Sequence, residues 1–157
     1  MTPSPTLHAT AVLIGSQAVL IRGASGSGKS RLALDLIQAA QNSSNPALPF
    51  ARLVGDDRVH VEATSSRLLV RPAATLAGLL EVRGLGIRRL PYEPVAQIGL
   101  IVDLAAPDAA RLPAEAAETT VISGVILPRL TVAPGAAALP LILAWRATDP
   151  RVSPSGH

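Results

Sequence analysis

The chain has 157 residues but no cysteine, a single lysine, and only one each of phenylalanine, tyrosine and tryptophan. Without cysteine, the protein has no disulfides, iron–sulfur clusters or zinc sites built from thiolates. The sequence also lacks an apolar run of the ~20 residues that a membrane-spanning helix needs, and its amino terminus lacks the basic segment that begins a signal peptide. These absences predict a cytoplasmic protein with no membrane partner.

The aliphatic content is high, because 48% of the residues are hydrophobic although aromatics are nearly absent. This length and composition predict one domain with a core of leucine, valine, isoleucine and alanine. We expect the domain to span residues 7–147, after a disordered lead at residues 1–6 and before a disordered tail at residues 148–157. The formal net charge of +3 comes from arginines scattered along the chain. Nucleic-acid binding usually needs a concentrated basic patch with stacking aromatics, so we expect no nucleic-acid partner.

The one lysine, Lys29, lies in the segment Gly23–Ser30, whose sequence G-A-S-G-S-G-K-S matches the phosphate-binding pattern G-x-x-x-x-G-K-[ST]. Glycines let backbone N–H groups close around phosphates, and lysine supplies a compact charge that the forked guanidinium of arginine cannot replace. The apolar segment Gln17–Ile21 precedes this loop as a predicted strand, and Arg31–Gln41 has the apolar periodicity of a helix. Strand, loop and helix together predict a binding site for a nucleotide or another polyphosphate.

The remaining pattern predicts an α/β domain with a mixed sheet that is richer in antiparallel pairs than a doubly wound fold. A hairpin over Leu7–Ile14 and Gln17–Arg22 leads directly into the phosphate-binding loop, and a short helix or turn is expected at Pro72–Leu80. Further strands are predicted at Ala51–Gly55, Val59–Ala63, Arg67–Val70, Ile98–Leu104 and Leu139–Trp145.

Three acidic sites are candidates for work with a bound nucleotide, because phosphoryl transfer needs Mg²⁺ and usually a carboxylate that takes the acceptor's proton. Asp56 and Asp57 follow a predicted strand, Asp103 lies late in another, and Glu81 precedes a glycine-rich turn. Each site also has a purely structural interpretation, as a solvated turn, a strand-end cap or a surface ion pair. The residues alone predict a nucleotide-binding domain that transfers a phosphoryl group, and they leave the acceptor open.

One longer segment and two shorter features are more specific than the phosphate-binding loop. The segment Leu80–Ile87 reads L-E-V-R-G-L-G-I, His8 lies fifteen residues before Gly23, and Asp56–Arg58 is an Asp-Asp-Arg run. Together they resemble the HPr kinase/phosphorylase family, whose signature is L-E-I-R-G-L-G-I, and the resemblance runs from about Leu7 to Trp145. It implies a P-loop kinase domain with a mixed, partly antiparallel sheet of the HPr kinase / PEP carboxykinase type. It also implies an ATP-dependent protein-serine kinase that uses Mg²⁺ to phosphorylate the phosphocarrier protein HPr or a homologue. The resemblance is also compatible with assembly into a homo-oligomer.

The resemblance assigns roles to individual residues. Asp57 would be the base that takes the proton from the acceptor serine, with His8 standing next to it, and Arg111 falls where the family has a catalytic arginine. Ser30 and Glu81 would hold Mg²⁺, and the lysine of the loop would also spread the charge that develops during transfer. The nucleotide-binding positions are Gly23, Ala24, Ser25, Gly26, Ser27, Gly28, Lys29 and Ser30.

The sequence departs from the family pattern in two respects. Longer members carry an amino-terminal domain and carboxy-terminal helices, so we expect a minimal form that consists of the catalytic domain. The family's dephosphorylation loop is basic around a Pro-Gly pair, whereas the equivalent Thr131–Ala136 contains neither arginine nor lysine. Because phosphate binding relies on nearby cations, the sequence predicts a kinase with weak or absent phosphorylase activity.

Two other functions stay open at the level of sequence. The first is a small-molecule kinase or NTPase in which Asp103 holds the metal, as the apolar strand before it suggests. The second is a nucleotide-sensing module without transfer chemistry.

Overall fold

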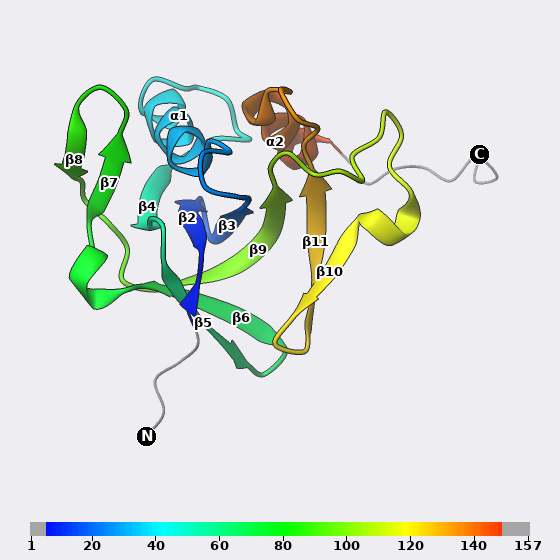
Figure 1. Cartoon of the computed structure of the whole chain (residues 1–157), viewed down its shortest axis with the longest axis horizontal. Helices are drawn as coiled ribbons and strands as arrows, with labels where there is room; N and C mark the ends of the chain where they lie inside the picture. Colours follow the sequence, from blue (N-terminus) through cyan, green and yellow to red (C-terminus); the bar gives the residue numbers. More distant parts are fainter. Residues whose placement is uncertain (1–5, 149–157) are drawn as a thin grey trace.

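The computed structural model describes residues 6–148, which form two α-helices, two short 3-10 helices and eleven strands (Figure 1). No helix among these residues is long and apolar enough to cross a membrane. The strands are β1 (Thr6–Leu7), β2 (Ala9–Ile14), β3 (Gln17–Arg22), β4 (Ala51–Gly55), β5 (Val59–Thr64), β6 (Arg67–Pro72), β7 (Leu79–Val82), β8 (Gly86–Arg89), β9 (Ala96–Asp103), β10 (Thr119–Ile122) and β11 (Val125–Thr131). The helices are α1 (Lys29–Gln41), α2 (Ala138–Ala147), η1 (Ala74–Leu76) and η2 (Glu115–Ala117).

Nine strands form one mixed sheet, whose main path has the order β1-β5-β6-β9-β3-β2-β4. In its centre β3 runs parallel to β9 and antiparallel to β2, and β11 continues the sheet beside β9 in parallel. The sheet is curled, and α1 and α2 both lie on one side of it (Figure 1). The strands β7 and β8 form a separate two-stranded sheet. The predicted mixed sheet, rich in antiparallel pairs, is therefore confirmed.

The central strands are buried on both faces. One set of side chains, including Val12, Val19 and Val102, packs against Leu32, Leu36 and Ile142 of the two helices. The alternate set includes Leu20 and Ile101 and packs inside the curl of the sheet. Burial on both faces explains why these strands are almost continuous apolar runs in the sequence.

The predicted strand at Leu139–Trp145 is wrong, because these residues belong to α2. Ala138 and Ile142 are buried one helical turn apart, a spacing that an unbroken apolar run conceals. Pro140 lies in the first turn of the helix, where its missing N–H removes no helical hydrogen bond.

Most other predicted elements lie within about two residues of the observed ones. The strand predicted over Leu7–Ile14 is interrupted at His8, and the short helix or turn predicted over Pro72–Leu80 contains η1 but also the first residues of β7. The strands β7, β8, β10 and β11 were not predicted. The expected lead and tail lie outside the described residues, except that Thr6 pairs with His60 in the sheet and that Thr148 directly follows α2.

Candidate functional site

The β2–β3 hairpin places His8 beside the glycine-rich loop. In this hairpin Ala9 is the cross-strand partner of Arg22. Because His8 directly precedes Ala9 and Gly23 directly follows Arg22, both leave the sheet at the same edge. The register of this hairpin thus brings His8 and Gly23 together, although they lie fifteen residues apart in the sequence.

The loop Gly23–Ser30 is held in a turn by its own backbone. The Ser27 N–H donates to the Ala24 carbonyl at 3.0 Å. Gly26 and Gly28 have φ of 83° and 100°, in the left-handed region that favours glycine. A Cβ on Gly23 would collide with the Ser27 side chain. Three of the motif's glycines are therefore required by the conformation of the loop.

Lys29 is buried, with 7% of its surface exposed, and its ammonium group donates to the carbonyls of Gly23 and Ala24 at 2.8 and 3.1 Å. It is also the first residue of α1. The residue before it, Gly28, has no side chain to cap the helix, and the first turn contains no acidic residue. The amides and the positive end of this helix are therefore left for an anion.

Asp56 is a buried carboxylate that connects three parts of the site. Its Oδ1 accepts hydrogen bonds from the hydroxyls of Ser30 at 2.7 Å and Thr10 at 2.8 Å. Its Oδ2 accepts a longer one from the backbone N–H of Glu81 at 3.3 Å. No cationic side chain among the described residues forms an ion pair with it. A buried carboxylate that has hydrogen bonds but no cationic partner is suited to stand close to a metal ion.

Asp57 faces His8, as expected, with 2.9 Å between Asp57 Oδ1 and His8 Nε2. The backbone of Asp57 has φ of 68°, which is unusual outside glycine and is best tolerated by aspartate and asparagine. This conformation turns the chain sharply after β4 and leaves the Asp57 side chain 61% exposed. Such strained positions are frequent at functional sites.

These groups line one cleft of about 680 Å³, a volume within the range of small-molecule sites. The cleft brings together the loop, the turn after β4, the start of β2 and strand β7. Its lining residues are His8, Thr10, Ser25, Gly26, Gly28, Lys29, Ser30, Arg31, Leu34, Asp57, Glu81, Val82 and Arg83.

The cleft contains oxygen ligands that suit a magnesium ion bound together with phosphates. Within residues 6–148, no group of three or more histidine and acidic side chains forms a complete metal cage. Mg²⁺ in phosphate-transfer sites needs no such cage, because it keeps several waters and binds one or two protein oxygens plus the substrate. The hydroxyl of Ser30 and the carboxylate of Glu81 lie in the same cleft, and Asp56 orients the first of them.

Asp103 lies outside this cleft and is fully engaged elsewhere. Its two oxygens accept hydrogen bonds from Arg22 at 2.7 and 2.8 Å and from Arg129 at 2.6 Å. Arg129 also binds Asp108 through both of its terminal nitrogens, at 2.7 and 3.1 Å. Burial alone raises the pKa of the Asp103 carboxyl, but the hydrogen bonds and charges of the two arginines outweigh it and hold that pKa below its ordinary value. These ion pairs raise the pKa of the Arg129 guanidinium.

Of the predicted nucleotide-binding positions, Gly23, Ala24 and Ser27 belong to the loop but are not among the residues that line the cleft. Arg111 is the predicted catalytic residue that the structure does not bring to the cleft. It is exposed in the segment between β9 and η2 and is not among the lining residues. Thr10, Arg31 and Arg83 line the cleft although the sequence did not predict them there, and Asp56 has a role that the sequence did not distinguish from that of Asp57. A polar residue inside the apolar run of β2 was the available signal for Thr10.

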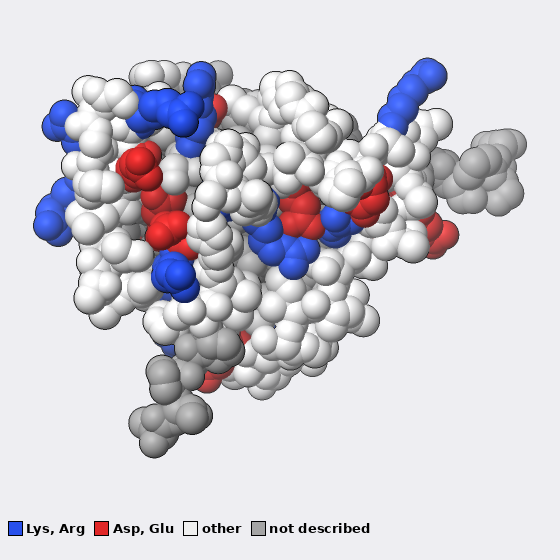
Figure 2. All heavy atoms as spheres, viewed as in Figure 1, with Lys and Arg blue, Asp and Glu red and all other residues white. Residues whose placement is uncertain are grey.

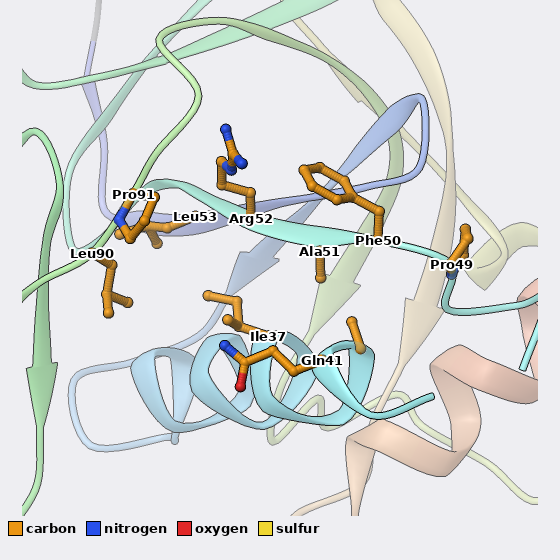
Figure 3. Close-up of a pocket in the computed structure, with 10 residues that line it drawn as sticks. Ile37, Gln41, Pro49, Phe50, Ala51, Arg52, Leu53, Leu90 and Pro91 are labelled. Carbon is orange, nitrogen blue, oxygen red and sulfur yellow. The ribbon is translucent and has the colours of Figure 1, made fainter. Parts of the chain in front are cut away.

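A second hollow of about 270 Å³ lies between α1 and β4, and no acidic residue lines it. Figure 3 shows Ala51 on the side of β4 that faces Ile37 of α1, whereas Phe50 and Arg52 project from the other side. The Arg52 guanidinium lies 5.2 Å from the centre of the Phe50 ring and pairs with Glu93. This hollow has neither a base nor a phosphate-binding loop.

The family described as HPr serine kinase C-terminal domain matches residues 1–133. An HPr kinase/phosphorylase of Limosilactobacillus reuteri is 37% identical over 144 residues, which cover 84% of this chain and 42% of that protein. An HPr kinase/phosphorylase of an Exiguobacterium species is 40% identical over 88 residues, which cover 55% of this chain and 25% of that protein. The chain thus spans less than half the length of these relatives.

The fold also has a counterpart among solved structures. The Hpr(Ser) kinase/phosphatase from Coxiella burnetii matches with a TM-score of 0.69 at 24% sequence identity. The match covers 89% of this chain and 91% of that one, so the two proteins share a fold.

Proposed function

Because this chain belongs to the HPr serine kinase family, we propose that it transfers the terminal phosphoryl group of ATP to a serine hydroxyl of the phosphocarrier protein HPr or of a related carrier. The observation that carries the proposal is the 2.9 Å contact between His8 and Asp57 in the same cleft as the glycine-rich loop. Since ATP is the proposed donor, the cytoplasm is the compartment in which this reaction would take place.

We take the strand, loop and helix over β3, Gly23–Ser30 and α1 as a P-loop that binds the phosphates of ATP. Lys29 holds its ammonium group inside the loop through two backbone carbonyls, from which it can turn to the outer phosphates. The uncapped first turn of α1 adds backbone N–H donors and a positive helix end. No acidic side chain in that turn competes with the nucleotide.

Asp57 is the proposed base. The serine oxygen bonds to the terminal phosphorus while the bond from that phosphorus to the oxygen of ADP breaks, and the hydroxyl proton passes to the Asp57 carboxylate. Asp57 is exposed enough for a protein side chain to reach it, and His8 Nε2 donates to its Oδ1 and so fixes its direction. Lys29 spreads the charge that grows on the phosphoryl oxygens.

Ser30 and Glu81 are the residues that would hold Mg²⁺. When bound, the ion neutralises charge on the phosphate oxygens. Asp56 acts on this site indirectly, because it accepts the Ser30 hydroxyl proton in a hydrogen bond and ties the backbone of Glu81 to the same point. Arg111 keeps the role that the resemblance gives it only if its segment reaches the cleft when a substrate is bound.

A small-molecule kinase or NTPase that uses Asp103 for its metal is disfavoured by a specific observation. Both oxygens of Asp103 are taken by Arg22 and Arg129, so neither is free to bind an ion. A nucleotide-sensing module without transfer would leave the contact between His8 and Asp57 without a purpose.

A phosphotransfer assay tests the proposal. The purified protein is incubated with HPr, Mg²⁺ and ATP labelled on its terminal phosphate, and we expect label on one serine. Asp57→Asn removes the proton acceptor and should slow transfer by about 10²- to 10⁴-fold while ATP still binds. Asp103→Asn is assayed under conditions in which the variant is folded. Its rate of phosphoryl transfer should exceed that of Asp57→Asn by at least about tenfold. Absence of label from HPr and from every carrier tried, or equal losses in the two variants, would overturn the proposal.

A further inference from the structure

The β7–β8 hairpin is fixed to the site at one end and exposed at the other. Leu80 of β7 is completely buried in the core beneath the helices, and the backbone of Glu81 is bonded to Asp56. Beyond these anchors the hairpin turns at Gly84 and Gly86, whose φ values of 92° and 91° require glycine. The Leu85 N–H closes the turn on the Val82 carbonyl at 2.9 Å. The tip is therefore a fixed shape held next to the cleft.

Two large apolar side chains are exposed on this fixed tip. Leu85 and Ile87 each have 63% of their surface exposed. Ile87 is the cross-strand partner of Glu81, so the two side chains lie next to each other on one face of the hairpin. Because Glu81 lines the cleft, the apolar surface of Ile87 is continuous with the rim of the cleft. A molecule that covers Ile87 therefore also lies over the mouth of the cleft.

Positive charge surrounds these apolar side chains. Arg83, Arg88 and Arg89 are exposed, and none of their side chains forms a hydrogen bond or ion pair with another of the residues 6–148. Figure 2 shows basic side chains along the edge of the molecule where β7 and β8 lie in Figure 1, bordering a group of acidic side chains. Apolar side chains bordered by arginine are the composition of a protein interface, in which arginine is enriched.

We propose that the tip of the β7–β8 hairpin is the docking surface for the protein acceptor, and that it binds an acceptor face on which apolar side chains are bordered by carboxylates. This inference rests on the proposed function and adds the surface that selects the acceptor. A second copy of this chain seated on Ile87 would obstruct the cleft, so it fits the same surface less well than the substrate does. A small-molecule acceptor would not need apolar surface beyond the rim.

The test uses the double variant Leu85→Ser/Ile87→Ser, because both side chains are exposed and neither supports the core. We expect the KM for HPr to rise at least about tenfold, while kcat and the KM for ATP stay within about twofold of the wild-type values. Arg88→Glu/Arg89→Glu should also raise the KM for HPr, and its deficit should shrink with added salt.

A matched control is available on the other hairpin. Val121 and Ile126 are cross-strand partners in β10 and β11, with 62% and 73% of their surfaces exposed, and neither lines the cleft. Val121→Ser/Ile126→Ser removes a similar apolar surface and should leave every constant unchanged. Sedimentation of the wild-type protein and each variant reports the oligomeric state in parallel.

The outcomes separate this inference from the proposed function. If the wild-type protein transfers phosphate to HPr and the Leu85/Ile87 variant keeps the same KM for HPr, the docking surface is wrong and the function stands. If that variant changes its oligomeric state and loses affinity for ATP and HPr together, the tip is a contact between subunits and the inference is also wrong. If the wild-type protein labels no carrier, the proposed function fails and the docking inference fails with it.

Discussion

Asp56 is the residue on which the geometry of the cleft depends most. Its two oxygens hold the hydroxyls of Thr10 and Ser30 and the backbone N–H of Glu81, which come from β2, α1 and β7. It has 6% of its surface exposed, so all three contacts are made away from bulk water. A carboxylate is the only side chain of this size that offers an acceptor in both directions.

Asp56→Asn should therefore destabilise the fold as well as weaken the site. The asparagine oxygen can replace one carboxylate oxygen, but its amide then faces either the two hydroxyls or the N–H of Glu81. We expect the free energy of unfolding to fall by about 1–3 kcal/mol, measured by urea denaturation. Glu62→Gln is the control, because its partner Arg71 is on the surface and the change should be below about 1 kcal/mol. Equal effects would show that Asp56 has no special structural role.

The ion pairs of Asp103 predict a dependence of stability on acid. Its pKa in the folded protein lies below the ordinary value of 3.8, so its ionised form stabilises the fold. That contribution is complete above about pH 5 and is lost as the pH falls through the folded pKa. We expect Asp103→Asn to lower the free energy of unfolding at pH 7 by roughly 2–4 kcal/mol. The difference from wild type, followed by urea denaturation, should narrow toward pH 3, and a difference that stays constant would contradict the prediction.

At the scale of elements, the sequence predicted the helices and strands that have a clear motif or a clear apolar periodicity. The hairpin over β2 and β3, the loop and α1 follow from an unbroken motif and a clear periodicity. The helix α2 did not, because Ala138–Trp145 is apolar throughout and only its packing selects helix over strand. The contacts of the site were equally hard to predict where they depend on tertiary packing. The position of Asp57 after a predicted strand placed it near the loop, and the resemblance gave it a role. The link from Asp56 to Glu81 depends on how β7 lies against the turn after β4.

A proline in α2 tests its helical state directly. Ala144 is an exposed interior residue of α2, so a substitution there changes little packing. Ala144→Pro removes a helical hydrogen bond and should cost about 3 kcal/mol or more, whereas Ala144→Gly should cost about 1 kcal/mol. Thermal unfolding followed by circular dichroism measures both. Similar midpoints for the two variants would count against a helix at this position.

At the scale of the whole molecule, the distribution of cations predicts which direction of the reaction is favoured. The segment Thr131–Ala136 turns at Gly135 before α2 and carries no lysine or arginine. Reversal needs inorganic phosphate and a phosphoserine bound together, which calls for nearby cations. We expect phosphate-dependent dephosphorylation of seryl-phosphorylated HPr to be at least about tenfold slower than ATP-dependent phosphorylation.

The dephosphorylation assay follows release of phosphate from HPr in millimolar inorganic phosphate. Ala136 is exposed, so Ala136→Arg adds a cation to this segment without disturbing the core. That variant should raise the reverse rate more than the forward rate. Comparable forward and reverse rates in the wild-type protein would refute the prediction.

The pairing of Ala9 with Arg22 has a consequence for how the protein opens. The cross-strand ladder that ends in this pair is flanked by β9 on one side and by β4 on the other, so we expect its amide protons to exchange with solvent more slowly than those of the outer strands. Fraying of the outer strands β1 and β10 leaves that ladder closed. The spacing between His8 and the phosphate-binding loop is thus set by a ladder that has another strand on each side.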